Sequence, residues 1–337
     1  MKRITIYPLI WLLLIGFTSA VSAQESTYKK KPGYWTLGLN GGFAYQQSDV
    51  PTRFDGFGLG LTLGKNLYYA PNAPFSFSAR GRLLYSRTYG LDDAQSFGLQ
   101  FNDALNGTNG VDYTQAGGGP GFVYQNHKTD LGELGLEGVL TFNQLRERTG
   151  VILSLYGGLG LDLYKTKLDQ LDGVLPYNDG YTSLNPQGSR SSIRNQLKEN
   201  ILDGVYETDA HSYEDGARLS VMPSLGFELG YQLTPSFSMG LGHRITWARH
   251  DLLDGQQWND NNTLTGDNDI HHYTSLHMRW DINKRERPLE LPQITIIDPS
   301  YNPYTAPNPN ASVRARIKNV SSAMDVSATL NGYTLPF

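Results

Sequence analysis

Residues 35 to 45 read WTLGLNGGFAY, and residues 56 to 64 read GFGLGLTLG. In both stretches large apolar side chains occupy alternate positions, with glycine or polar residues between them. A two-residue period is typical of a β-strand with one apolar face. The period returns along the chain and predicts eight strands, at 35–45, 57–67, 75–89, 131–142, 151–164, 218–231, 236–249 and 270–282.

The N-terminus carries the features of an export signal. Residues 1–3 are positively charged at two positions, residues 4–15 are mostly apolar, and residues 21–23 form a small-residue cleavage site. We assign residues 1–23 to a removed signal peptide, because the apolar run is too short for a membrane-spanning helix. No other stretch approaches the roughly 20 apolar residues that such a helix needs. For an exported chain of alternating strands, we predict a closed antiparallel transmembrane β-barrel with its apolar face toward lipid.

The amino-acid composition excludes several classes of function. The chain of 337 residues has 37 Gly, 21 Tyr and no Cys, which excludes a disulfide framework, a thiol nucleophile and a lipidated cysteine anchor. Its net charge of −4 gives no sign of nucleic-acid binding. We expect a protein that is not an enzyme and that uses no cofactor or metal.

The predicted connections alternate in length. Long connections at 46–56, 90–130, 165–217 and 250–269 are separated by short ones, as in outer-membrane barrels with short periplasmic turns and longer outside loops. Both barrel ends are therefore expected in the periplasm. Aromatic residues should form a girdle near each rim. The predicted members are Trp35, Tyr68, Tyr69, Phe75, Phe142, Tyr231, Phe237 and Trp280 at one rim, and Tyr45, Tyr85, Tyr89, Tyr164 and Trp247 at the other.

The side chains between the lipid-facing ones should point into the barrel, and several of them are charged. These residues are Arg80, Arg82, Arg218, Arg244, Arg279, Glu133, Glu137, Asp162, Glu228 and Asp281. We predict cross-strand ion pairs between Arg80 and Glu137 and between Asp162 and Arg218. An eight-stranded barrel has an interior that side chains can fill, so this network is expected to plug it. A narrow gated ion path is the alternative. His243 falls on the lipid-facing phase.

The long loops leave further alternatives open. Segments 97–102 and 122–126 could form an extra hairpin and give ten strands, and residues 192–202 are expected to form a short helix capped by Ser191 or Ser192. Loop residues Asp92, Asp93, Asp209 and His211 could be imagined as an acid–base pair at the rim.

The chain changes character after residue 282. We predict an N-terminal periplasmic segment at 24–34, a linker at 283–292, and short strands at 293–297, 312–320 and 325–330. Residues 293–337 resemble the opening of an immunoglobulin-like sandwich, but a complete one needs about 100 residues and seven strands. We expect a fragment that continues beyond Phe337 into further periplasmic modules.

In strands 35–45 and 57–67, in the lumen residues around Arg80, Arg82, Glu133 and Glu137, and in the final strand, the chain resembles the OmpA-type small outer-membrane barrels. The resemblance implies a Gram-negative outer-membrane protein with both terminal segments in the periplasm. It also implies a division into a barrel and a periplasmic domain that grips peptidoglycan, although no such domain appears before Phe337.

We therefore expect a structural and interaction protein: a plugged barrel that anchors a periplasmic arm and displays long extracellular loops. The expected partners are outer-membrane lipid and proteins that contact the loops or the periplasmic tail, not nucleic acid. Two alternatives remain: a narrow gated pore for ions or small solutes, and a rim hydrolase acting on lipid or peptide.

Overall fold

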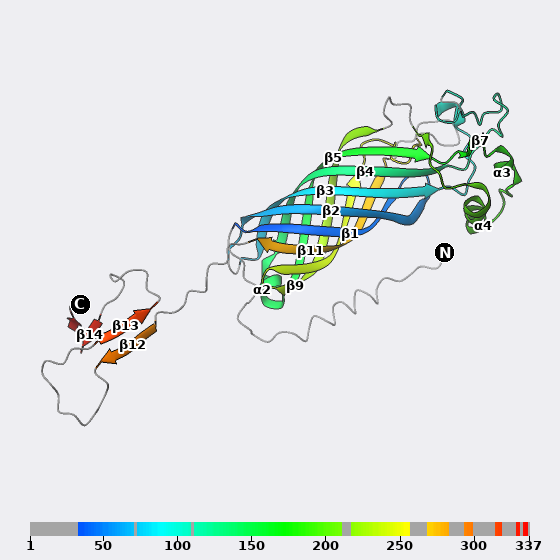
Figure 1. The fold of residues 1–337 in the computed structure, drawn as a ribbon. Coiled ribbons are helices and arrows are strands. Elements are labelled where there is room, and N and C mark those ends of the chain that lie inside the picture. The colour runs from blue at the N-terminus through cyan, green and yellow to red at the C-terminus, as the bar shows by residue number, and fades with distance from the viewer. Residues whose placement is uncertain are drawn as a thin grey trace. The chain divides into compact units, whose positions relative to one another are not determined.

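A computed structural model describes residues 33–70, 73–108, 111–210, 217–256 and 268–282, and the backbone of four short strands in the tail. Eight long antiparallel strands close into a barrel, because β1 pairs with β11 as well as with β2 (Figure 1). Their bounds are β1 Trp35–Gln47, β2 Thr52–Tyr68, β3 Phe75–Leu91, β4 Asn126–Phe142, β5 Val151–Leu168, β9 Arg218–Thr234, β10 Phe237–Trp247 and β11 Ile270–Ile282. The predicted eight-stranded barrel is confirmed.

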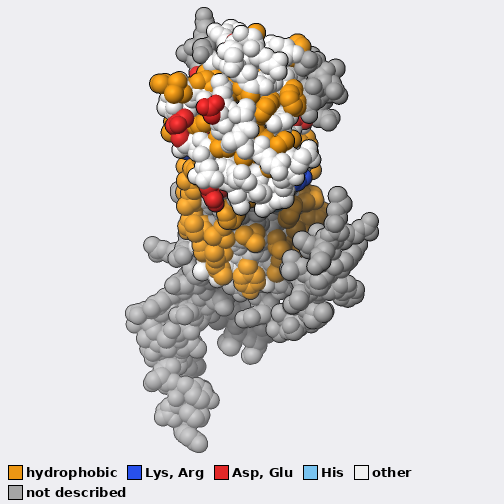
Figure 2. Space-filling model, turned by 90° about the vertical axis from the view of Figure 1, so that its right-hand side faces the viewer, with side chains coloured by type: hydrophobic (Ala, Val, Ile, Leu, Met, Phe, Trp, Pro, Cys, Tyr) orange, Lys and Arg blue, Asp and Glu red, His pale blue; other side chains and the backbone are white. Residues whose placement is uncertain are grey.

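The barrel is apolar outside and polar inside. Leu59, Leu136 and Leu225 are 59%, 68% and 56% exposed, although each lies in the middle of a strand. Between such positions, the side chains that point inward are buried and mostly polar, such as Asn40 and Thr62. Hydrophobic side chains cover the barrel wall below the loops (Figure 2). This inverted pattern is that of a transmembrane barrel.

Among the described residues, no helix is long and apolar enough to cross a membrane.

The two ends of the barrel differ. One end, the short-loop end, carries the connections 69–74, 143–150 and 235–236, together with the start of β1 and the end of β11. The opposite end, the long-loop end, carries 48–51, 92–125, 169–217 and 248–269. The predicted long first loop at 46–56 is wrong, because β1 and β2 continue past the predicted strand ends and leave only residues 48–51 between them.

The described parts of the connections 92–125 and 169–217 form a folded head at the long-loop end (Figure 1). It contains η1 Leu99–Phe101, β6 Leu171–Asp172, β7 Leu175–Pro176, α3 Asn178–Ser183, α4 Arg190–Gln196, η2 Leu197–Ile201 and β8 Thr208–Asp209. The ten-strand alternative is wrong: η1 occupies one flank of the supposed hairpin, and a single bridge joins Ser96 to Val123. The predicted helix exists, but it starts earlier and Ser189 caps it through the Ser192 N–H.

The head has a hydrophobic core of its own, which we call the head core. Its buried members are Leu91, Leu99, Ala104, Leu105, Val111, Tyr113, Val123, Tyr124, Leu168, Tyr177, Tyr181, Leu184, Ile193, Leu197 and Ala210. Arg194 of α4 fastens the head to the barrel rim, since its guanidinium donates to the carbonyl oxygens of Leu91 and Pro51. The described parts of the long loops are therefore folded and packed against one another.

Residues 283–337 form a second compact unit. In its described part, β12 Gln293–Asp298 pairs with β13 Arg314–Lys318, and β14 Ala328–Leu330 pairs with β15 Tyr333–Leu335. These are two separate two-stranded sheets, so the immunoglobulin-like start is not supported. The predicted signal peptide at 1–23 and linker at 283–292 lie outside the described residues.

Candidate functional site: the charged barrel interior

Seven of the predicted lumen residues meet in one network of ion pairs. Arg80 lies opposite Glu137 on neighbouring strands, and its Nε is 2.6 Å from a Glu137 oxygen. Its Nη1 also reaches Glu228, at 2.5 Å, across the barrel from β3 to β9. The predicted Arg80–Glu137 pair is therefore confirmed, and it is one part of a larger cross-barrel network.

The other members extend the network in both directions along the axis. Arg82 binds Glu137 at 2.8 Å, and Arg279 binds Glu228 at 2.5 Å. Arg244 makes a two-pronged pair with both oxygens of Glu133. Such forked pairs fix geometry as well as charge. The side chains of these residues are buried, apart from Arg279, which is 16% exposed.

An aromatic ring and several glycines accommodate the neighbouring guanidiniums. The Tyr156 ring lies 4.4 Å from the Arg80 guanidinium and 5.5 Å from that of Arg82. Inward glycines leave room for the long charged side chains; a Cβ added to Gly135 would lie 2.5 Å from a Glu133 oxygen. The inner phase of the strands thus encodes both the charges and the space they occupy.

The remaining three predicted lumen residues lie elsewhere. The predicted Asp162–Arg218 pair is wrong. Ser220 lies opposite Asp162, Arg218 lies two residues further along, opposite Tyr164, and neither carboxyl oxygen of Asp162 has a hydrogen-bond partner among the described residues. Asp162 instead faces Glu133 of β4 in the strand register, and its side chain is buried. Asp281 lies at the short-loop end, where it lines a cavity.

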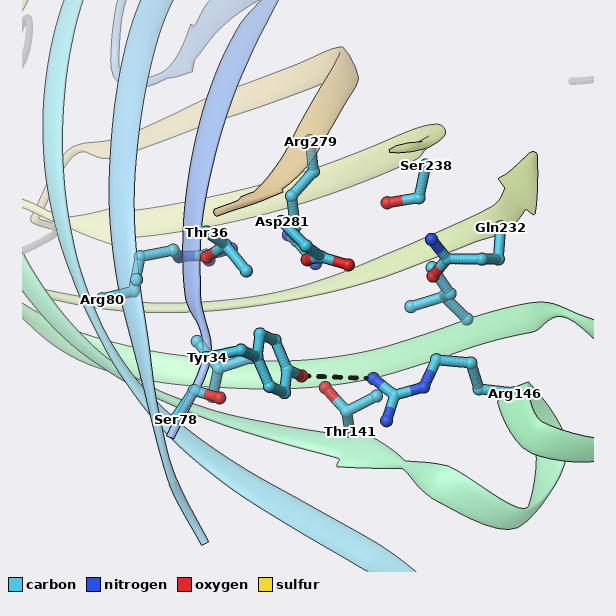
Figure 3. A pocket seen from close by; sticks show the side chains of 13 residues that line it. Tyr34, Thr36, Ser78, Arg80, Thr141, Arg146, Gln232, Ser238, Arg279 and Asp281 are labelled. Carbon is cyan, nitrogen blue, oxygen red and sulfur yellow. Dashed lines mark hydrogen bonds between the residues drawn. The ribbon is translucent and has the colours of Figure 1, made fainter. Parts of the chain in front are cut away.

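That cavity sits at the inner mouth of the short-loop end (Figure 3). Its volume is about 40 Å³, and Arg80, Arg279 and Asp281 are among the residues that line it. Arg146 enters from helix α2, Asn143–Thr149, and its guanidinium lies 3.3 Å from the Tyr34 hydroxyl. The space suffices for a few water molecules, which is far from a continuous channel.

Loop residues fill the interior at the long-loop end. The Leu253 carbonyl accepts hydrogen bonds from Thr129 and Thr166, which point inward from β4 and β5. Asp254 accepts from the Val50 N–H at 3.1 Å, and Asp269 accepts from the Leu253 N–H at 2.7 Å. Burial raises the pKa of Asp254 to about 7 and that of Asp269 to about 9.

Sequence reasoning missed several of these residues. Tyr156 lies on the inward phase of β5, and this phase could have identified it if the inward aromatic residues had been considered together with the charged ones. Arg146 had no such signal, because it lies in a connection. Two predicted rim residues also face inward: Tyr164 packs with Leu131 and Met222, and Tyr69 binds Glu147.

Two members of the imagined acid–base pair are engaged with basic side chains. Asp93 pairs with Arg190, and Asp209 lies 3.3 Å from the Lys165 amine, while His211 lies outside the described residues. Within the described part of the chain, no three metal-ligating side chains gather. The contacts of the interior are buried ion pairs and hydrogen bonds between polar side chains.

Comparisons with known proteins find weak similarities to solved structures. No family model matches the chain, and no curated protein matches it. Among solved structures, Neisserial surface protein A is 11% identical, with 75% of this chain and 99% of that chain covered and a TM-score of 0.33. Ail, the attachment invasion locus protein of Yersinia pestis, is 10% identical, covering 75% and 100%, with a TM-score of 0.34.

A major outer membrane protein from Thermus thermophilus is 13% identical over 75% of this chain and 100% of that chain, with a TM-score of 0.34. Similarities at this level say nothing about what this chain binds or does. The class is defined by the chain's own strands: a closed, eight-stranded transmembrane β-barrel with a charged interior.

Proposed function

We propose that this chain is a bacterial outer-membrane structural and interaction protein, in which a plugged barrel carries a folded extracellular head and a periplasmic arm. The observation that carries the proposal is the interior itself. Ion pairs between Arg80, Glu137 and Glu228 bridge opposite walls, and they are buried rather than arranged around an open path.

The ends of the lumen support the same function. The segment around Leu253 fills the long-loop end, and the side chains of Arg146 and Tyr34 narrow the short-loop end. Two cavities along this path are small, about 40 Å³ at the mouth and about 10 Å³ beside Arg82. A solute would have to displace several paired charges at once, which opposes the pore alternative.

The head supports an interaction role. The long loops bury a hydrophobic core, although a loop that only connects two strands needs no core of its own. The β6–β7 turn raises Val174 and Leu175 to the surface, where they are 84% and 68% exposed. We assign this surface to the outside of the cell, because long loops of outer-membrane barrels face outward. Exposed apolar side chains at this turn can contact a protein partner.

Planar-bilayer recording combined with unfolding tests the plug. The wild-type barrel should show no steady conductance, and Arg80→Ala should be markedly less stable because it leaves Glu137 and Glu228 without that partner. Arg249→Ala, which removes an exposed arginine of the 248–269 connection, is the matched control and should change neither quantity. A steadily conducting wild type, or an Arg80→Ala barrel of unchanged stability with sharply raised conductance, would favour the gated pore.

A further inference from the structure

Two histidines lie on the outward, lipid-facing phase of adjacent strands. His243 of β10 and His272 of β11 each sit between two buried residues along their own strand. The outward positions two residues away include the large apolar side chains of Leu241, Ile245 and Ile270. Ionisable side chains on a membrane-facing surface are costly, so a pair of them calls for a functional explanation.

The strand register places the two rings side by side. His243 lies opposite Thr274 and His272 lies opposite Ile245, so the histidines are diagonal neighbours across β10 and β11. The distance between His243 Nε2 and His272 Nδ1 is 3.4 Å. That separation is longer than an ordinary hydrogen bond. It matches the roughly 3.3–3.4 Å between two nitrogens that each lie about 2.0–2.1 Å from one tetrahedral zinc ion.

The surroundings hold both rings in position. His243 Nδ1 is 2.8 Å from Thr274 Oγ1. When Nδ1–H donates to that oxygen, the unprotonated Nε2 faces His272, and such a hydrogen bond is the usual support of a metal-binding histidine. The His272 ring stacks on Tyr45, with ring centroids 4.7 Å apart and planes 4° from parallel. The Phe227 ring lies beside that of His243, with centroids 6.2 Å apart.

We propose that His243 and His272 form a two-histidine site for a divalent transition metal ion, with water completing the coordination. Neutral imidazole suits Zn²⁺ and Cu²⁺, whereas Ca²⁺ and Mg²⁺ prefer oxygen ligands. Thr274 acts as a positioning residue. The site is on the outside of the barrel wall and is independent of whether the lumen is plugged.

Zinc binding to the full folded chain in detergent micelles tests the proposal. At about pH 7.5, about one unit above the ordinary pKa of a histidine side chain, we expect one Zn²⁺ per chain in competition with a chromogenic chelator. His243→Gln and His272→Gln should each weaken binding at least about tenfold. Thr274→Val should weaken it by about tenfold. The matched control is His250→Gln, which changes an exposed histidine of the 248–269 loop and should bind zinc like the wild type.

Two further readouts test the site directly. Cu²⁺ bound to the wild type should show two imidazole nitrogens by electron paramagnetic resonance, and one in either single histidine variant. In the wild-type chain, Zn²⁺ should protect His243 and His272, but not His250, from modification by diethyl pyrocarbonate. This measurement uses the wild type alone and therefore does not depend on a variant folding. The proposal is overturned if the wild type binds no metal, if either histidine variant binds as tightly as the wild type, or if zinc protects neither ring.

Discussion

The barrel interior and the head core are both densely buried, but the first is built from charged side chains and the second from apolar ones. Inside the barrel, Arg244 and Glu133 are buried as a forked ion pair. In the head, Tyr181 and Leu197 are completely buried in an apolar core. The strands must turn their apolar side chains toward lipid, so only the polar phase is left for the lumen. The head stands beyond the lipid-facing band, in water, and can bury its apolar residues in the ordinary way.

The difference has consequences for stability. A buried ion pair is sensitive to the loss of one partner, because the other charge is then stranded. An apolar core loses stability in proportion to the volume that is removed. The two regions should therefore respond differently to substitution and to pH. They should also differ in how much of the molecule a single substitution destabilises.

The largest expected effect follows from stranding a charge in the lumen. Arg244→Ala should lower the free energy of unfolding of the barrel by about 3–5 kcal/mol, because Glu133 stays buried without its partner. Denaturant titration followed by tryptophan fluorescence and by heat-modifiable gel migration measures this loss. The double variant Arg244→Met/Glu133→Leu should recover most of it. A single variant as stable as the wild type would show that the pairs do not hold the interior.

A cavity in the head core should have a smaller and more local effect. Leu197→Ala should destabilise the head by about 2–4 kcal/mol through lost apolar contacts. Limited proteolysis should then cut the 169–217 connection faster while the barrel keeps its gel migration. Leu175→Ala, at an exposed position of the same connection, is the control. Equal sensitivity of barrel and head would contradict their separation into two cores.

The smallest expected effect is a pH dependence of the head's resistance to proteolysis. Burial raises the pKa of Asp169 to about 7, although it accepts hydrogen bonds from the Tyr177 hydroxyl and the Gly204 N–H. A raised carboxyl pKa means that the folded head binds a proton where the unfolded chain has released it. The extra stability is therefore complete below about pH 4 and is lost as the pH rises through about 7.

Proteolysis of the head between about pH 5 and 8 measures this dependence. The wild-type head should become easier to cut as the pH rises, and Asp169→Asn, which mimics the protonated carboxyl, should flatten the change. Asp172→Asn, at an exposed position, should leave the wild-type profile unaltered. A head that becomes more resistant with rising pH would contradict the assignment.

Particular residues show how far the sequence carried the prediction. The alternation that starts at Trp35 predicted the eight strands, and the register it implies placed Arg80 opposite Glu137 correctly. The same method misplaced Arg218, which lies on the same face of the sheet as the residue opposite Asp162 but two positions further along β9. Strand ends were also missed, since polar residues such as Gln46 in β1 and Thr52 and Asp55 in β2 extend the strands beyond their apolar runs.

What the sequence determined by itself is the inversion of the barrel: a strict two-residue period sends each side chain to one of two faces, so the lipid face and the lumen face are written into the order of residues. What only the tertiary structure decided is which side chains meet. The partnership of Arg80 with Glu228, the entry of Arg146 into the mouth and the approach of His243 to His272 join residues from different strands or connections. Their distances depend on strand register, barrel closure and side-chain packing, none of which a local periodicity specifies.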